Sequence, residues 1–346
     1  MTNVLTNTLK NRQYVFAARP EDEATAGCFG QVETVLPALK PGQILCRNLW
    51  LSVDPYLRLK MHDRESYTPP LQIGEAIPGN SVAQVVTSAD PAFEAGDMVA
   101  ISGGWQEYAV VRAAHAKRVD PALSRPQSWL GALGMTGFTA YGGLLSIGQP
   151  KAGETVVVSA AAGAVGSLVG QIARQLGCRV VGIAGGPEKC ARVVADFGFD
   201  ACVDYRAEGF AGALAAACPK GVDVYFENVG GKVAAAVMPL LNMFARIPVC
   251  GLISQYDGQS GTDPKALEEF MRWVLVRRLT LRGFIVYDLY QNHPEFTDTM
   301  AGWLRSGAIR EEFNLHSGFD QVVPAFLGML KGAGFGKTLV QIAEPV

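Results

Sequence analysis

From about residue 129 onward, short apolar runs alternate with segments of helix length, and this alternation constrains the fold more than any other feature. Strands are expected at residues 155–160, 179–185, 201–206, 222–228, 246–254 and 279–286. Helices are expected between them, at 164–176, 187–197, 210–218, 232–243 and 264–277. Parallel strands covered on both faces read as Val/Ile runs. The pattern predicts an α/β fold with a doubly wound parallel sheet.

The first third of the chain has a different sequence pattern, in which short strand-like runs are separated by Gly/Pro turns. Residues 43–53, 81–88 and 98–101 are examples, and such spacing predicts a β-barrel or sandwich. The tail ends in another strand-like run, 338–342. We therefore expect a discontinuous first domain, residues 1–128 and 310–346, and a second domain at 129–309.

A dinucleotide-binding turn is predicted where the first strand of the second domain meets its helix. Residues 161–166 read Ala-x-Gly-x-x-Gly, with alanine in the first glycine place. Gly163 would let the backbone approach a pyrophosphate, and Gly166 would let the helix pack closely on the strand. Ala164 and Val165 lie at the helix start, which offers amides and a positive dipole to the phosphates.

The end of the second strand indicates which dinucleotide is bound. An NAD site normally has an acid there for the ribose diol, but residues 184–186 read Ala-Gly-Gly, and Lys189 and Arg192 follow. Cations without a carboxylate favour a 2′-phosphate and hence NADPH. Tyr205 would add a phenol hydrogen bond. The alternative is that Lys189 and Arg192 form a solvated helix face.

Charge and spacing exclude several other classes of protein. Lys plus Arg is 30 and Asp plus Glu is 32, a net charge of −2, which argues against a nucleic-acid-binding protein. Residues 155–173 carry no charge, but they read as strand, turn and helix rather than as a membrane span. The four histidines lie far apart without ligand spacing, so no metal site is expected. Residues 332–338 fail the P-loop spacing, and residues 258–262 fail Gly-x-Ser-x-Gly.

Two observations bear on the cellular compartment. Residues 1–10 contain no apolar stretch of the kind found in a secretory signal. The seven cysteines are never closer than 12 positions, which excludes CxxC motifs and is typical of reduced thiols. A cytoplasmic protein is expected.

Six motifs in the same order resemble one family, the zinc-free branch of the medium-chain dehydrogenase/reductase superfamily. This branch includes prostaglandin reductases, also called leukotriene hydroxydehydrogenases, plant double-bond reductases and bacterial curcumin reductases. The motifs are LSVDPY at 51–56, MTGFTAY at 135–141, AAAGAVG at 160–166, FENVGG at 226–231, CGLISQY at 250–256 and GFIV at 283–286.

The resemblance implies a GroES-like β-barrel domain built from both chain ends, a Rossmann domain between them, bound NADPH and a homodimer. Pairing of two copies at the edge strand, residues 282–286, would also fit an uncovered apolar strand. The zinc-dependent relatives carry Gly-His-Glu where this chain has Pro-Gly-Asn at 78–80. The zinc ligand is thus missing, as is the cysteine cluster of the structural zinc.

The resemblance also implies a set of cofactor-binding residues. These are Gly163, Ala164, Val165, Gly166, Lys189, Tyr205, Asn228, Cys250, Gly251, Ile253, Ser254, Tyr256, Phe284, Ile285, Val286 and Gly334. Two positions depart from the family. Gly186 stands where serine is common, and Gly334 stands where asparagine is common, so those side-chain contacts are lost.

The expected reaction is NADPH-dependent reduction of the carbon–carbon double bond of an α,β-unsaturated ketone or aldehyde without zinc. Charge develops on the carbonyl oxygen and needs a donor. Tyr256 is the first candidate, because a phenol stays protonated at neutral pH, and Tyr56 is the second. The alternatives are an NADP-dependent alcohol dehydrogenase, a quinone reductase and a non-catalytic NADPH-binding protein.

Overall fold

Six parallel strands form one sheet in the computed structural model, which describes residues 9–257 and 264–346. The strands are β8 Thr155–Ser159, β9 Arg179–Ala184, β10 Ala201–Asp204, β11 Val222–Phe226, β12 Leu241–Val249 and β13 Thr280–Gly283. Their order is β10-β9-β8-β11-β12-β13. The chain runs outward from β8 to β10 and then returns to β11 beside β8. Such a reversal marks the ligand crevice of a doubly wound sheet, at the carboxyl ends of the strands.

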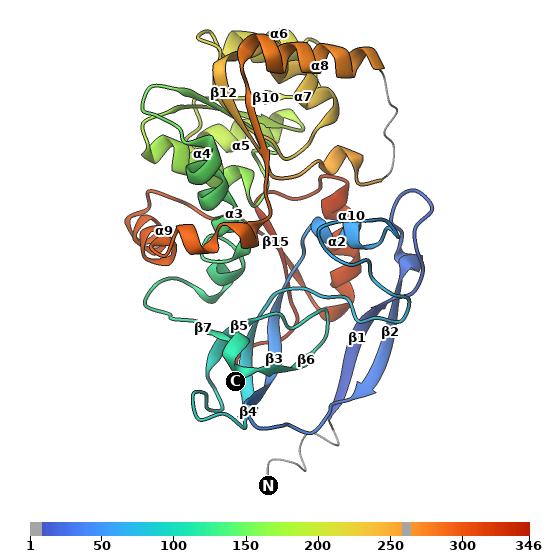
Figure 1. The fold of residues 1–346 in the computed structure, drawn as a ribbon. Coiled ribbons are helices and arrows are strands. Elements are labelled where there is room, and N and C mark those ends of the chain that lie inside the picture. Colours follow the sequence, from blue (N-terminus) through green and yellow to red (C-terminus); the bar gives the residue numbers. More distant parts are fainter. Residues whose placement is uncertain (1–8, 258–263) are drawn as a thin grey trace. The chain divides into compact units, whose positions relative to one another are not determined.

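Helices connect these strands along the chain, from the green to the orange part of the ribbon (Figure 1). The connecting helices are α4 Gly166–Gln175, α5 Pro187–Phe197, α6 Phe210–Ala217, α7 Gly231–Val237 and α8 Pro264–Arg277, while α3 Met135–Gly143 precedes β8 and α9 Phe296–Ser306 follows β13. Val156, Val157 and Val158 of β8 are fully buried. Burial of consecutive residues requires cover on both faces of the sheet, as the Val run predicts.

The largest difference from the sequence prediction lies between α7 and β12. The sequence predicts a helix over residues 232–243, but α7 ends at Val237, and a 3-10 turn at Met238–Leu240 leads into β12. Pro239 cannot donate a backbone hydrogen bond and does not continue a helix. Leu241 and Ala245 are fully buried in the sheet, so packing decides that this segment is a strand.

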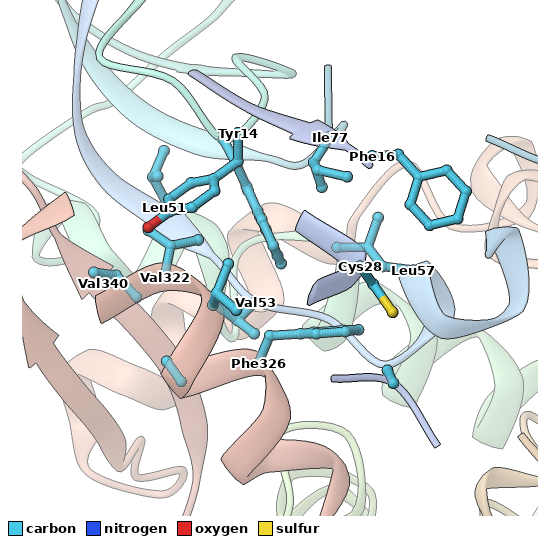
Figure 2. Close-up of a cluster of buried hydrophobic side chains, with 14 of the residues drawn as sticks. Tyr14, Phe16, Cys28, Leu51, Val53, Leu57, Ile77, Val322, Phe326 and Val340 are labelled. Atoms are coloured by element: carbon cyan, nitrogen blue, oxygen red, sulfur yellow. The ribbon is translucent and has the colours of Figure 1, made fainter. Parts of the chain in front are cut away.

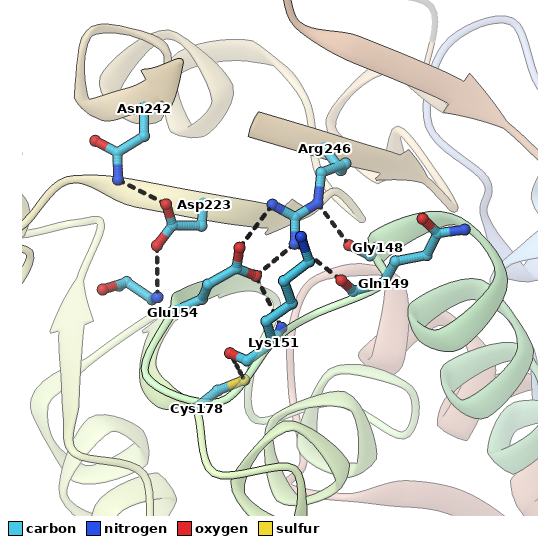
Figure 3. A network of polar contacts seen from close by, with 9 residues as sticks. Gly148, Gln149, Lys151, Glu154, Cys178, Asp223, Asn242 and Arg246 are labelled. Atoms are coloured by element: carbon cyan, nitrogen blue, oxygen red, sulfur yellow. Dashed lines mark hydrogen bonds and ion pairs between the residues drawn. The ribbon is translucent and has the colours of Figure 1, made fainter. Parts of the chain in front are cut away.

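Arg246 of β12 ties the start of β8 to the loop before it (Figure 3). Its guanidinium donates to the carbonyl oxygens of Gly148, at 2.9 Å, and Gln149, at 3.0 Å, and to both carboxylate oxygens of Glu154, at 3.1 and 2.5 Å. Burial alone would raise the pKa of Glu154, but Arg246 and the Lys151 amide lower it below its ordinary value. The pair therefore stabilises the fold with Glu154 ionised.

The chain divides into two compact units, each described here by itself. The second unit, which contains the parallel sheet, is Gly131–Glu312 with Phe335–Lys337. The first unit comprises the described residues of Met1–Leu130, Phe313–Gly334 and Thr338–Val346. Both ends of the chain thus contribute to the first unit.

The first unit is built mainly from antiparallel strands. A seven-stranded sheet has the order β14-β15-β3-β4-β5-β7, with β6 paired to β3, and β1 pairs with β2 in a separate sheet. The bounds are β1 Lys10–Phe16, β2 Phe29–Val35, β3 Gln43–Ser52, β4 Ser81–Ser88, β5 Met98–Ile101, β6 Tyr108–Arg112, β7 Lys117–Arg118, β14 Phe313–Ser317 and β15 Lys337–Gln341, with helices α2 Tyr56–Lys60 and α10 Val322–Leu330.

The core of the first unit joins segments from both ends of the chain. Phe16 and Leu51, near its start, and Phe326 and Val340, near its end, are fully buried in one cluster (Figure 2). The predicted fold class is confirmed: a GroES-like β-barrel domain and a Rossmann domain with a doubly wound parallel sheet. Among the described residues, no helix is both long and apolar enough to cross a bilayer.

Replacing Arg246 with leucine should destabilise the second unit by about 3 kcal/mol at pH 7, because the mostly buried Glu154 carboxylate loses its cation and two carbonyls lose the guanidinium that donates to them. The folded-state pKa of Glu154 is depressed. The stabilisation is therefore complete above the unfolded value of about 4.3 and is lost as pH falls through the folded value.

Urea unfolding of the wild type and the variant at pH 7 and pH 4 measures this effect. Arg272→Leu, which breaks an exposed pair with Glu269, is the control and should cost less than about 1 kcal/mol. An Arg246→Leu difference that does not shrink in acid would contradict the role given to Glu154.

Candidate functional site

The turn after β8 brings the start of α4 against the end of that strand. Ala160 has a positive φ of 51°, and a Cβ atom on Gly166 would lie 2.3 Å from the Ala160 carbonyl oxygen. A Cβ on Gly163 would lie 3.2 Å from the same oxygen. Glycine is therefore required at 166, as the close helix–strand contact of a dinucleotide fingerprint predicts.

The backbone amides of this turn lie together at the start of α4. The Ser167 amide donates back to the Gly163 carbonyl at 3.0 Å. The amides of Ala164 and Val165, in the turn before α4, and of Gly166, the first residue of α4, precede it, and N–H groups at the start of a helix have no intrahelical acceptor. With the helix dipole they can bind a phosphate. The structure thus brings these predicted residues together at one helix start.

A short segment from the C-terminal part of the chain, Phe335–Lys337, lies against this turn, and we call it the C-terminal strap. The Gly336 amide donates to the Ala162 carbonyl at 2.8 Å, and Gly336 forms a parallel bridge with Gly163. A Cβ on Gly336, whose φ is 80°, would lie 2.0 Å from the Glu312 carbonyl oxygen. The glycine-rich run at 332–338 leads into strand β15. Its glycine at 336 thus serves close packing beside the phosphate turn.

Gly334, the last of the predicted cofactor residues, belongs to the first unit. Its φ is 87°, and a Cβ there would lie 2.4 Å from Asn314 Nδ2. The asparagine that is common in the family at this position would therefore require Asn314 to move. Its cofactor contact stays a prediction.

Positive charge gathers where β9 and β10 end. Burial and the nearby Arg206 lower the pKa of Lys189. The Arg206 guanidinium lies 5.6 Å from the Tyr205 ring centroid, and the Lys232 ammonium lies 5.1 Å from it. We call Lys189, Tyr205, Arg206 and Lys232 the cationic cluster. Like charges that repel each other in this way are stabilised by an anion placed among them.

One carboxylate near the cationic cluster is already engaged by the backbone. Asp204 Oδ1 accepts hydrogen bonds from the Gly186 amide at 2.8 Å and the Arg206 amide at 2.9 Å. These two amides lower the pKa of Asp204. Asp204 thereby fixes the two turns that carry Lys189 and Arg206.

Arg192 does not join the cationic cluster in the way its sequence position suggests. Its guanidinium bonds Asp196 at 2.9 Å and lies 3.8 Å from the Phe335 ring centroid. Phe335 in turn stacks on Phe197, with ring centroids 5.1 Å apart. Arg192 therefore holds the C-terminal strap on α5.

Sequence reasoning missed Arg206 and Lys232. Arg206 directly follows the predicted Tyr205, and Lys232 lies at the start of α7. The one sequence feature that could have indicated Arg206 is its place directly after Tyr205, at the end of a predicted strand. Its meaning depends on β9 and β10 being neighbours, which only the sheet order shows.

Two loops at the ends of β11 and β12 hold the predicted residues Asn228 and Cys250 to Tyr256. Asn228 Nδ2 donates to the Ser159 carbonyl and the Asn228 amide donates to Ser159 Oγ, both at 2.8 Å. The Ile253 amide donates to the Asn228 carbonyl at 3.2 Å, and the Ser254 amide to Val229 O at 3.0 Å. The two loops are thus joined along their length, and the predicted residues lie together.

The Tyr256 phenol lies over the backbone of its own loop. A Cβ on Gly251 would be 3.2 Å from the Tyr256 hydroxyl oxygen. Burial, with the nearby Cys250 as second cause, raises the pKa of Tyr256 above its ordinary value. Burial and the Glu227 carboxylate raise the pKa of Cys250 to about 12. Both groups are therefore protonated at neutral pH, and Tyr256 can donate a hydrogen bond.

The predicted residues after β13 take different positions. The Phe284 ring packs against α3, where a Cβ on Gly143 would lie 2.4 Å from it, and meets Phe226 edge-on at 6.2 Å. Val286 is also buried. Ile285 is half-buried, and its amide donates to the Asp288 carboxylate at 3.2 Å. The Phe284 ring is thus used for packing, and cofactor contacts by these three residues stay predictions.

Tyr56 lies in the first unit, whereas Tyr256 lies in the second. It is the first residue of α2 and packs, partly buried, against the cluster of Figure 2. This is a packing position, and a role for Tyr56 in the reaction stays a prediction.

Two further expectations concern motifs. Within residues 9–257 and 264–346, no group of three or more histidine, cysteine, aspartate or glutamate side chains could hold a metal ion. Residues 258–263, which include the whole of the rejected Gly-x-Ser-x-Gly match at 258–262, lie outside the described residues.

Comparisons with known proteins agree with this geometry. Residues 12–119 match the family model of the N-terminal domain of oxidoreductase, and residues 164–304 match that of zinc-binding dehydrogenase. The NADPH-dependent curcumin reductase of Escherichia coli is 45% identical over 96% of this chain and 97% of its own length. The 2-alkenal reductase (NADP(+)-dependent) of Nicotiana tabacum is 38% identical over 87% of this chain and 88% of its own length.

A solved structure is similarly close. CurA from Vibrio vulnificus in complex with NADPH is 46% identical, has a TM-score of 0.92 and covers 96% of this chain and 100% of its own. Identity at this level over nearly the whole chain shows the family. The chain belongs to the medium-chain dehydrogenase/reductase superfamily, in its zinc-free reductase branch.

Proposed function

We propose that this chain uses NADPH to reduce the carbon–carbon double bond of α,β-unsaturated ketones and aldehydes. Two relatives are named NADPH-dependent curcumin reductase and 2-alkenal reductase (NADP(+)-dependent), and a 2-alkenal is an α,β-unsaturated aldehyde. The observation that carries the proposal is the half-buried Tyr256 phenol on the loop that follows β12, whose pKa burial raises above its ordinary value. It is a neutral donor at the carboxyl ends of the sheet, where a doubly wound fold binds its ligands.

The residues of the second unit fit NADPH. Gly163 and Gly166 leave the backbone space that a Cβ would fill, and the start of α4 offers amides to the pyrophosphate. The cationic cluster supplies charge and a phenol for the 2′-phosphate, and the loops with Asn228 and Cys250 would hold the nicotinamide half. When bound, NADPH supplies the hydride.

Tyr256 has a separate task in this proposal. Negative charge develops on the carbonyl oxygen of the substrate as its double bond is reduced, and a hydrogen bond aimed there is usually the largest protein contribution. The Tyr256 hydroxyl would donate that bond and hold the proton that the product needs. Because the ordinary pKa of a phenol is about 10 and burial raises that of Tyr256 further, the donor is present over the whole physiological pH range.

We also propose a homodimer that pairs through β13. This strand ends the sheet and pairs with β12 on one side. The Phe284 amide points to the Val249 carbonyl at 3.4 Å, and alternate residues of a parallel strand face opposite neighbours, so the Gly283 N–H points away from β12. An open strand edge is a ready partner for a second copy.

The cysteines support a location for this enzyme. All seven are free thiols, as is usual in a reducing compartment. We propose that it acts in the cytoplasm.

Replacing Arg206 with glutamine should weaken NADPH binding by about tenfold, because the 2′-phosphate loses one charge-assisted hydrogen bond. NADH affinity should stay within twofold, since NADH lacks that phosphate. Titration calorimetry measures the change in affinity for NADPH and for NADH separately. Arg174→Gln, which changes an exposed arginine paired with Asp200, is the control. Equal losses for both nucleotides would contradict the assignment of Arg206.

Purified protein should oxidise NADPH when supplied with enones, and not when supplied with NADPH and a saturated ketone. A panel of enones, quinones and, with NADP, alcohols separates the alternatives by absorbance. Turnover confined to quinones or alcohols would overturn the proposal. Tight NADPH binding without any turnover would indicate a non-catalytic binding protein.

Tyr256→Phe should lower kcat for an enone about 100-fold and leave NADPH affinity within twofold, because it removes a donor and keeps the ring. The pKa of Tyr256 is raised, so wild-type kcat should fall only as pH rises above about 10. The variant should lack that decline. A variant with unchanged kinetics would remove Tyr256 from the mechanism.

Gly283→Pro should convert the dimer to a monomer, because proline removes the outward N–H of the edge strand. Gly283→Ala is the matched control, since a Cβ at this position meets nothing within 4 Å. Light scattering should give twice 36.9 kDa for the wild type and the alanine variant, and 36.9 kDa for the proline variant. A monomeric wild type would contradict the dimer.

A further inference from the structure

Glu227 is a buried acid that the reaction above does not use. It follows the last residue of β11, beside the point where the strand order reverses, and is 4% exposed. A buried carboxyl group is costly unless hydrogen bonds replace its water. The partners of Glu227 therefore indicate what this residue does.

One side-chain oxygen of Glu227 collects three donors. Oε1 accepts from the Val229 amide at 2.7 Å, the Gly230 amide at 3.0 Å and Ser159 Oγ at 3.0 Å. The loop can curl around the carboxyl group because Gly230 and Gly231 have positive φ values of 77° and 54°. Gly230 is also the N-cap residue of α7, where a negative group is favoured by the helix dipole.

The backbone of Glu227 holds the second loop. Its carbonyl oxygen accepts from the Cys250 amide at 2.9 Å and the Gly251 amide at 3.2 Å, and its own amide donates to the Pro248 carbonyl at 3.0 Å. A single residue thus binds the loop after β11 through its side chain and the loop after β12 through its main chain.

Ser159 connects Glu227 to Asn228. Its hydroxyl donates to Glu227 and accepts from the Asn228 amide, and its carbonyl accepts from Asn228 Nδ2. The Asn228 amide is therefore held by a hydroxyl that has two acceptors, Glu227 Oε1 at 3.0 Å and the Phe226 carbonyl at 3.2 Å, and the Asn228 side chain is held by the carbonyl of the same serine. Removing the Glu227 carboxyl group would take away one acceptor of the Ser159 hydroxyl and so weaken the restraint on the Asn228 amide.

We propose that Glu227 is a positioning residue: it fixes the loop after β11 and the loop after β12, which would hold the nicotinamide half of NADPH. The inference rests on the proposed NADPH-dependent function. The two halves of the cofactor should then depend on Glu227 differently. The cationic cluster, at the ends of β9 and β10, would hold the adenosine half whether or not Glu227 is present. The nicotinamide half, and with it turnover, would depend on Glu227.

Two variants of Glu227 that differ in side-chain length test this role. Glu227→Gln keeps the oxygen that accepts three hydrogen bonds, whereas Glu227→Asp withdraws the carboxyl group by one methylene, about 1.5 Å. Affinity for 2′,5′-ADP, which carries only the adenosine half, should stay within twofold in both variants. Glu227→Asp should lose most of the change in NADPH fluorescence seen on binding, and its kcat for an enone should fall at least about tenfold. Glu227→Gln should recover much of both.

Glu94→Gln, which changes an exposed acid in the first unit, is the control and should match the wild type. Wild-type fluorescence and kcat in Glu227→Asp would overturn the proposal. A parallel loss of 2′,5′-ADP and NADPH affinity would also overturn it, because it would show general damage to the fold. If the wild type reduces no enone, the binding and fluorescence measurements still decide the role of Glu227 while the proposed reaction fails.

Discussion

The approach of α4 to the end of β8 is a steric constraint on which the rest of the second unit depends. A side chain at position 166 would place an atom 2.3 Å from the Ala160 carbonyl oxygen, so the helix can begin there only with glycine. Because it begins there, its amides lie at the carboxyl edge of the sheet. All strands of a parallel sheet end at that same edge. The cationic cluster, the Asn228 loop and the Cys250 loop are therefore carried to one edge by topology.

The acids at this edge are engaged by backbone amides, and this shapes the charge of the site. Asp204 accepts the amides of Gly186 and Arg206, and Glu227 accepts those of Val229 and Gly230. A carboxylate that accepts backbone amides stabilises a turn and contributes less to binding an external group. The acid nearest the cationic cluster thus orders its turns, while Lys189 and Arg206 still repel each other. An anionic ligand with a phosphate on its adenosine end is the partner that such an arrangement favours.

The sequence was sufficient for features that depend on local pattern. Alternating Val-rich runs predicted the parallel sheet, and the spacing of Gly163 and Gly166 predicted the phosphate turn. Features that depend on long-range neighbours were missed. Arg206 and Lys232 acquire meaning only from the order of the strands, and Arg192 is turned toward Phe335 by a strap more than a hundred residues further along the chain. The Phe284 ring fills the space that Gly143 leaves open, a packing role that the sequence did not indicate, and its cofactor contact stays a prediction. The start of β12 was missed because burial of Leu241 and Ala245 outweighs helical propensity.

The position of the proposed donor and the rise in its pKa have one physical origin. Burial is the main cause of the raised pKa of Tyr256, and that burial exists because the loop after β12 is held against the loop after β11. The Cys250 and Gly251 amides are anchored on Glu227, and the Ile253 amide is anchored on Asn228. If this packing loosened, the phenol would gain water, its pKa would return toward the ordinary value, and its hydroxyl would lose its fixed direction. Packing of the two loops therefore fixes the direction of a donor that is already neutral at physiological pH because the ordinary pKa of a phenol is about 10.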